Sequence, residues 1–73
     1  MSKFEIGKAY MNSGLYTGPY FVTVVDRDKN SITVVETSYP NDGYITYPII
    51  AKNGIEYAKI WDYQGQIGYM QSN

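Results

Sequence analysis

Asp26, Asp28 and Asn30 stand at alternate positions in the stretch "DRDKNSITVVET", which is how the oxygen ligands of a calcium loop begin. Such a loop also needs glycine at its sixth position and glutamate at its twelfth, where this chain has Ser31 and Thr37. Aspartate and asparagine at this spacing also suit an exposed turn, because their side chains bond to nearby backbone groups. We therefore predict a hairpin turn here and no metal site.

Two pairs of carboxylates could approach across neighbouring strands and exchange protons with a substrate: Asp26 with Glu36, and Glu56 with Asp62. The chain has no histidine and no cysteine, which excludes an imidazole base, a thiolate nucleophile and the usual zinc ligands. The stretch "GLYTGPY" lacks the Gly-Lys-Ser/Thr ending of a phosphate-binding loop. We predict a protein that is not an enzyme and that carries no cofactor.

Length and charge limit the remaining classes. The 73 residues make one small domain, residues 1–73, and the formal net charge of −1 disfavours binding to duplex nucleic acid. No stretch approaches the roughly 20 apolar residues of a membrane helix, and the first residues lack the apolar segment of a signal peptide. The expected location is the cytoplasm, with no membrane partner.

The stretch "YFVTVVDRDKNSITVVETS" is rich in β-branched and aromatic residues and predicts a first hairpin. A three-residue turn at 28–30, with Asn30 in the left-handed conformation, would place Arg27 opposite Ser31. This register separates the side chains cleanly, and we expect one of the two faces to be buried. The inward set is Tyr20, Val22, Val24, Ile32 and Val34, whereas Thr23, Thr33 and Thr37 lie outward with Phe21, Val25 and Val35.

A second hairpin follows in "YITYPIIAKNGIEYAKIWDY", because Asn53-Gly54 is the dipeptide that a type I′ turn favours. Pairing of Lys52 with Ile55 gives a predicted core face and an aromatic face. The core face holds Ile45, Tyr47, Ile49, Ala58 and Ile60. The opposite face holds Tyr44, Thr46, Pro48, Ile50, Tyr57, Lys59, Trp61 and Tyr63.

The rest of the chain fits the same plan. We expect an opening strand in "FEIGKAYMN", a loop from Asn12 to Gly18, a connection at "YPNDGY", a turn at Gln64-Gly65 and a short final strand. Pro48 cannot donate a ladder hydrogen bond, so we expect its strand at a sheet edge or a bulge. The fold class is therefore all-β: a five- to six-stranded antiparallel barrel or twisted meander.

This order of "IGKAY", loop, long hairpin, second hairpin and short last strand resembles an SH3-like small barrel, and the resemblance implies a closed, strongly bent sheet. The acidic loop and paired aromatics with which peptide-binding SH3 domains hold proline-rich ligands have no counterpart here, so no functional residue is transferred. The chain also resembles small uncharacterised proteins from Gram-positive bacteria and their mobile elements.

The candidate binding residues are those at the far end of the second hairpin: Tyr44, Tyr57, Lys59, Trp61 and Tyr63. Tyrosine and tryptophan are enriched at interface hot spots, so the first hypothesis is a module that binds a protein partner or itself. The same rings could instead stack on a glycan or on single-stranded nucleic acid, with Lys52 and Lys59 adding polar contacts. A third interpretation places the rings in a second core layer.

Overall fold

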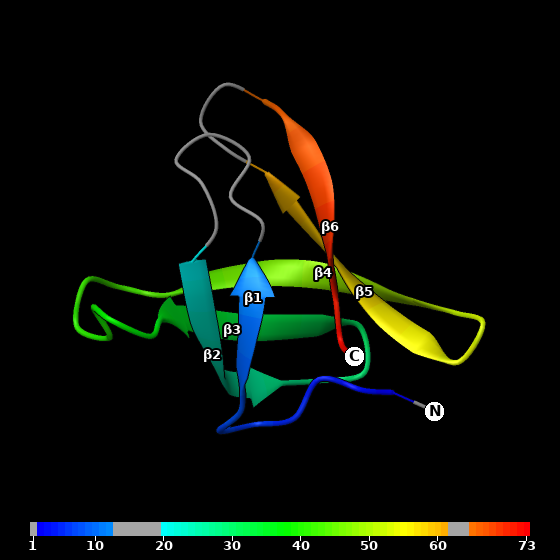
Figure 1. Cartoon of the computed structure of the whole chain (residues 1–73), viewed down its shortest axis with the longest axis horizontal. Coiled ribbons are helices and arrows are strands. Elements are labelled where there is room, and N and C mark those ends of the chain that lie inside the picture. Colours follow the sequence, from blue (N-terminus) through cyan, green and yellow to red (C-terminus); the bar gives the residue numbers. More distant parts are fainter. Residues whose placement is uncertain (1, 13–19, 62–64) are drawn as a thin grey trace.

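Six antiparallel strands follow one another along the chain, and each pairs with the next in a single sheet (Figure 1). They are β1 (Ala9–Asn12), β2 (Tyr20–Arg27), β3 (Ser31–Glu36), β4 (Ile45–Lys52), β5 (Ile55–Trp61) and β6 (Ile67–Gln71). The computed structural model describes residues 2–12, 20–61 and 65–73. Within these ranges there is no helix, and hence none that is long and apolar enough to span a membrane. The all-β prediction is confirmed.

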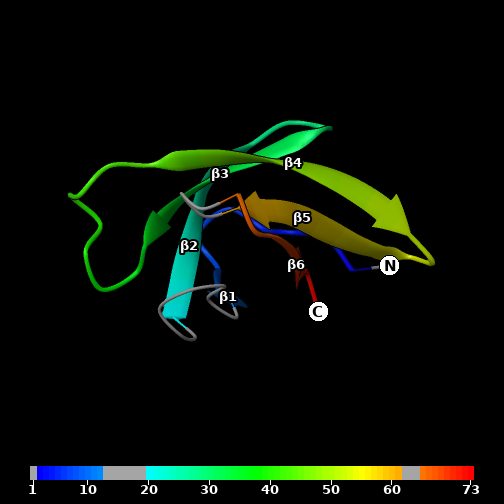
Figure 2. The same ribbon diagram turned by 90° about the horizontal axis from the view of Figure 1, so that it is seen from above.

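The sheet curls into a nearly closed barrel because β4 changes its partner along its length. The first half of β4 pairs with β3, from Val34–Ile45 to Ser31–Pro48. Its second half pairs with β5, from Ile49–Ala58 onward. Figure 2 shows the resulting curvature, which brings β1 and β6 back to the same side of the molecule.

The core lies inside this curl and comes from alternate residues, as the period-two pattern predicts. The predicted inward residues of the first hairpin are buried, except that Tyr20 is only partly buried against them. In the second hairpin Tyr47, Ile49, Ala58 and Ile60 are buried. Ile45 is a correction: its side chain is 50% exposed, because β5 no longer pairs with β4 at this end of the barrel.

The first turn differs from the predicted one by one residue. Arg27 pairs with Ile32 rather than with Ser31, and among the described non-glycine residues only Asn53 has a positive φ, so Asn30 is not left-handed. The Asp28 carboxylate makes this longer turn favourable, because its Oδ1 accepts hydrogen bonds from the backbone nitrogens of Asn30 (2.7 Å) and Ser31 (2.9 Å).

A bulge between Val24 and Asp26 then compensates for the extra turn residue. Beyond it Val24 pairs with Val34, which is the predicted partner. The inward and outward faces are therefore those expected, although the turn itself is not.

The second turn is confirmed. Lys52 pairs with Ile55, and Asn53 and Gly54 have φ values of 54° and 79°, as a type I′ turn requires. The expectation that Pro48 marks a sheet edge or a bulge is wrong, because β4 has neighbours on both sides and its ladders show no register shift at Pro48. Ile49 donates its N–H to Asn30 on the β3 side (2.9 Å), so the adjacent Pro48 nitrogen points toward β5, where the ladder has not yet begun.

The opening segment is only partly a strand. Residues 2–8 cross one end of the barrel before β1 begins, and Ser2 forms a bridge with Ile55. Phe4 is 1% exposed and packs edge-on against Tyr10, with ring centroids 4.9 Å apart. Phe4 therefore closes this end of the core, a role that the sequence pattern did not reveal. The predicted loop beyond Asn12 and the Gln64 half of the last turn lie outside the described residues.

Replacing Gly54 with valine should lower the free energy of unfolding by about 1 kcal/mol or more, because a β-branched residue is strained at positive φ. No atom would meet the new Cβ within 4 Å, so the effect isolates backbone strain. Chemical denaturation measures it. Gly54→Asn is the control, since asparagine tolerates this conformation. Equal stability of the valine variant and the parent would contradict the turn assignment.

Candidate functional site

Three of the five predicted binding residues lie together on the outer side of β5. Tyr57, Lys59 and Trp61 alternate with the buried residues Ala58 and Ile60, so their side chains point away from the core. The hairpin pairing predicted this alternation correctly.

The other two predicted residues do not join them. Tyr44 lies in the connection between β3 and β4 with a side chain that is 73% exposed, and it lines a different pocket. Tyr63 lies outside the described residues. The predicted hairpin register, continued from Lys52 and Ile55, would also place Thr46 opposite Trp61. This pairing is not formed, because the β4–β5 ladder ends at Ile49 and Ala58.

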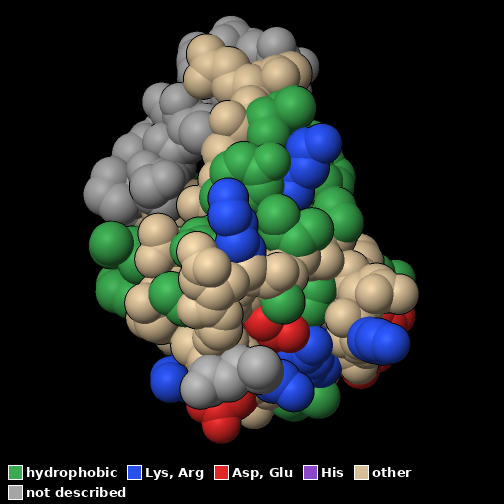
Figure 3. All heavy atoms as spheres, turned by 90° about the vertical axis from the view of Figure 1, so that its right-hand side faces the viewer, with side chains coloured by type: hydrophobic (Ala, Val, Ile, Leu, Met, Phe, Trp, Pro, Cys, Tyr) green, Lys and Arg blue, Asp and Glu red, His purple; other side chains and the backbone are tan. Residues whose placement is uncertain are grey.

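Strand β6 supplies the side chains that extend this surface. Its outward residues Ile67, Tyr69 and Gln71 stand opposite the outward residues of β5. We call the combined surface the outer β5–β6 face, made of Tyr57, Lys59, Trp61, Ile67, Tyr69 and Gln71. Figure 3 shows hydrophobic and basic side chains gathered on the side of the molecule that carries β6 and the β4–β5 hairpin. The sequence predicted this short final strand, but the candidate binding residues did not include its outward side chains, although the alternation in "IGYMQ" was their signal.

Trp61 lies on the outer face but also contacts one core residue. Its ring meets the buried Tyr47 edge-on, with centroids 4.9 Å apart and planes at 80°. The residue is nevertheless 47% exposed. These rings therefore do not form a second, fully buried core layer. One side of the Trp61 indole is exposed and could contact a partner.

A groove crosses this surface near the β4–β5 turn. Tyr57 and Tyr69 line it together with Ile50, Lys52 and Asn53. It offers two rings, one ammonium group and one amide, which is a set that can stack on a flat ligand and hydrogen-bond to its rim.

Next to the outer β5–β6 face, the barrel has an open seam. β1 and β6 are the two ends of the sheet order, and within the described residues no ladder joins them. The hollow along the seam is lined by residues 8–11 on one side and 69–73 on the other. Tyr69 lines both the seam and the groove, so the two features are neighbours.

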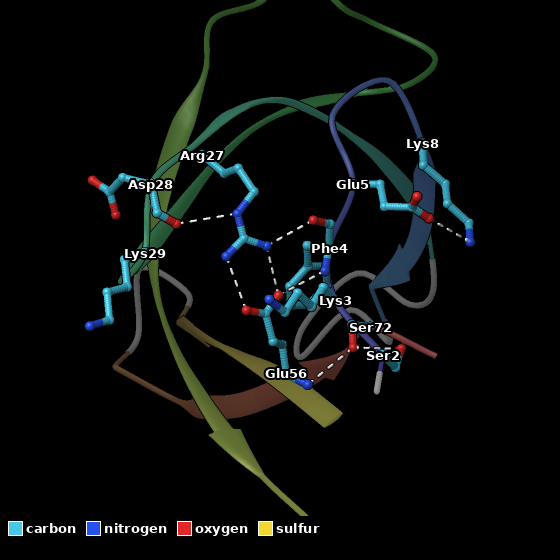
Figure 4. A pocket seen from close by; sticks show the side chains of 10 residues that line it. All are labelled: Ser2, Lys3, Phe4, Glu5, Lys8, Arg27, Asp28, Lys29, Glu56 and Ser72. Carbon is cyan, nitrogen blue, oxygen red and sulfur yellow. Dashed lines mark hydrogen bonds and ion pairs between the residues drawn. The ribbon is translucent and has the colours of Figure 1, made fainter. Parts of the chain in front are cut away.

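A second hollow lies where the opening segment crosses the barrel end (Figure 4). Arg27 reaches across it from β2 and binds Glu56 of β5 through two hydrogen bonds, Nη1 to Oε1 (2.7 Å) and Nη2 to Oε2 (3.0 Å). Arg27 Nη1 also donates to the Phe4 carbonyl oxygen (2.8 Å), and the Phe4 N–H donates to Glu56 Oε1 (2.8 Å). Lys8 and Lys29 point away from this centre.

These contacts make the hollow a structural joint rather than an anion site. Arg27 Nε donates to the Asp28 carbonyl oxygen (3.2 Å), so most donors of the guanidinium are already used inside the protein. The hydrogen bonds from Arg27 hold the pKa of Glu56 below its ordinary value, although burial acts in the opposite direction. The same pairing raises the pKa of Arg27.

The expected carboxylate pairs are not found among the described residues. Asp26 pairs with Thr33, whereas Glu36 pairs with Val22 several positions along the hairpin. Glu56 is held by Arg27, and its expected partner Asp62 lies outside the described residues. The described part of the chain also contains no group of acidic side chains that could hold a metal ion.

The chain matches no protein-family model, and comparisons with curated proteins and with solved structures likewise return no match.

The Arg27–Glu56 pair predicts a pH-dependent stability. Because the pKa of Glu56 is depressed in the folded state, its contribution is complete above the ordinary value of 4.5 and is lost as the pH falls through the lower folded value. Chemical denaturation of the parent between pH 7 and pH 3 should show this loss. The Glu56→Gln variant should lack this pH dependence, because it is already destabilised at every pH.

At neutral pH we expect Glu56→Gln to lower the free energy of unfolding by about 3 kcal/mol, because Arg27 is left without its counter-charge.

Glu5→Gln is the matched control, since the Glu5–Lys8 pair is exposed and should contribute less than about 1 kcal/mol. Equal costs for the two substitutions would show that the Arg27–Glu56 joint does not hold the barrel end.

Proposed function

We propose that this protein is a non-catalytic binding module, built on an SH3-like barrel, that holds an extended segment of a protein partner beside β6. The observation that carries the proposal is the outer β5–β6 face, whose exposed rings lie next to the unpaired edge of the sheet. The backbone of β6 would bind the partner's backbone, and the rings would contact its side chains.

The edge supports this mode of binding because it lacks the usual protection against strand pairing. Edge strands of natural proteins commonly carry lysine, proline or a bulge that discourages another strand from adding. The sequence of β6, "IGYMQ", has no charge and no proline. An added strand would extend the ladder on the seam side of β6, which is the β-augmentation mode of peptide recognition.

The face supports a partner with apolar side chains. Trp61, Ile67 and Tyr69 are each about half exposed and neighbour one another across β5 and β6. Tryptophan and tyrosine bury a large area at a small entropic cost, which is why they dominate interface energetics. Every second side chain of a strand added to β6 would lie beside Ile67 and Tyr69 on the same face of the sheet, because outward residues alternate along a strand.

A second candidate function rests on the groove between Tyr57 and Tyr69. Its two rings, with Lys52 and Asn53 beside them, could stack on a glycan or on the bases of single-stranded nucleic acid. Self-association through the β6 edge is a third outcome, in which the partner strand comes from a second copy.

The proposal predicts which substitutions remove peptide binding. Extended peptides selected from a displayed heptapeptide library should perturb the backbone amide NMR signals of residues 67–71 most strongly. Trp61→Ala and Tyr69→Ala should each weaken binding by about tenfold or more, as hot-spot residues do. Tyr44→Ala is the matched control, because Tyr44 is more exposed but lies away from the face. Trp61→Ala should cost no more than about 2 kcal/mol of stability, since its ring is only partly buried.

Methylation of alternate peptide backbone nitrogens distinguishes strand addition from simple side-chain contact. Methyl groups on the nitrogens that face β6 should abolish binding, whereas the intervening positions should tolerate them. Binding that is unchanged by methylation at every position would overturn the proposed mode.

Two further experiments test the other candidate functions. Light scattering at two concentrations would reveal a dimer. Titration with labelled oligonucleotides or oligosaccharides at low salt would test ligand binding in the groove.

A further inference from the structure

A small tyrosine-lined pocket lies at the end of the β2–β3 hairpin opposite the Arg27–Glu56 joint. Val22 and Val34, both buried, belong to its wall. Its volume is about 190 Å³, which is below the roughly 300 Å³ at which sites for drug-sized ligands begin. The pocket therefore suits one small chemical group. Its polar and aromatic lining is Tyr20, Tyr39, Tyr44, Tyr47, Glu36 and Asp42.

The four tyrosines come from three parts of the chain that only the fold brings together. Tyr20 begins β2, Tyr47 lies in β4, and Tyr39 and Tyr44 lie in the connection between β3 and β4. Tyr39 and Tyr44 are largely exposed, whereas Tyr47 is buried. The aromatic lining of the pocket thus includes both buried and exposed tyrosines.

The charge of the pocket has one sign. Glu36 and Asp42 line it, and its described lining residues include no lysine or arginine. Among the described residues, the ion pairs are Lys8 with Glu5 and Arg27 with Glu56, so neither pocket carboxylate has a basic partner of this kind. Among the described residues, the pocket lining thus combines two carboxylates with the tyrosine rings and has no basic side chain.

Two of the pocket tyrosines have raised pKa values, mainly because they are buried or partly buried. Burial raises the pKa of Tyr20, and the neighbouring Glu36 carboxylate raises it further. Burial also raises the pKa of Tyr47, with a further contribution from Tyr20. The Tyr20 hydroxyl, which accepts a hydrogen bond from Asn12 Nδ2 (3.2 Å), is held in place inside this acidic environment.

We propose that this pocket binds a small alkylammonium cation, such as the trimethylammonium group of choline or of a methylated lysine side chain. The negative π-face of a tyrosine ring attracts a cation, and methylated ammonium groups suit such rings because they have little water to lose. The carboxylates of Glu36 and Asp42 add attraction at longer range. An anion would be repelled by the same groups. This site is separate from the outer β5–β6 face, so it adds a second specificity to the proposed module.

The test compares choline with 3,3-dimethylbutan-1-ol, its uncharged isostere of the same shape. Choline should produce saturable NMR shifts confined to residues around Tyr20, Tyr39 and Tyr44. The isostere should bind at least about fivefold more weakly, because it gains no cation–π attraction. Equal binding of the two molecules, or choline shifts that never saturate, would overturn the proposal.

Substitutions at exposed positions distinguish the contribution of a tyrosine ring to choline binding from that of its hydroxyl group. They also distinguish the contribution of the carboxylate charge from that of side-chain shape. Tyr44→Phe should keep choline binding, whereas Tyr44→Leu should weaken it several-fold, because the π-face is what attracts the cation. Glu36→Gln should weaken it about threefold or more at low salt and less at high salt. Tyr69→Leu, on the other face, should have no effect. Unchanged binding in Tyr44→Leu and Glu36→Gln together would refute the assignment.

The source of the cation follows from a second titration, with a short peptide that carries trimethyllysine and the same peptide with unmodified lysine. Tighter binding of the methylated peptide than of choline identifies a protein-borne group, and tighter binding of choline identifies a free metabolite. Preference for the unmodified lysine peptide would contradict the proposal, since a primary ammonium group is more strongly hydrated.

Discussion

The Arg27–Glu56 pair is the interaction on which the closed shape depends. It joins β2 to β5, which are not neighbours in the sheet. The same two side chains also bind the backbone of Phe4: Arg27 its carbonyl oxygen and Glu56 its N–H. Burying two charges is costly unless their hydrogen bonds are satisfied, and here the opening segment supplies the remaining partners. The barrel end, the position of Phe4 and the path of the first residues are therefore one arrangement.

A barrel of this size has a single inward face, and that face is filled by small aliphatic side chains with Phe4, Tyr10, Tyr47 and Met70. The remaining large apolar side chains have no interior to enter. Several of them lie outside on β5 and β6 or around the tyrosine pocket, and others, such as Met11 and Phe21, lie on the outer faces of β1 and β2. Both proposed binding surfaces thus arise because the chain carries more aromatic residues than its core can hold.

The sequence correctly predicted those features of the structure that depend on residues close together in the chain. Alternation identified the buried faces of both hairpins, and Asn53-Gly54 identified a turn that only positive φ can make. The first turn was missed by one residue because a longer, Asp28-capped turn and a bulge produce the same faces as a shorter turn. The role of Phe4, the partner of Glu56 and the contribution of β6 depend on closure of the sheet, and no spacing within a single segment encodes that closure.

The two ends of the described chain also meet: Ser72 Oγ lies 2.8 Å from Ser2 Oγ, although 70 positions separate them. The ladders between the six strands join only consecutive strands, which close short loops quickly. The terminal contacts around Ser2, Phe4 and Glu56 close the largest loop and carry the largest entropic cost, so we expect them to form after the folding transition state. Interactions that form late govern the rate of unfolding rather than of folding. We therefore expect the contacts around Ser2, Phe4 and Glu56 to control the unfolding rate of the barrel, and with it the lifetime of the folded state.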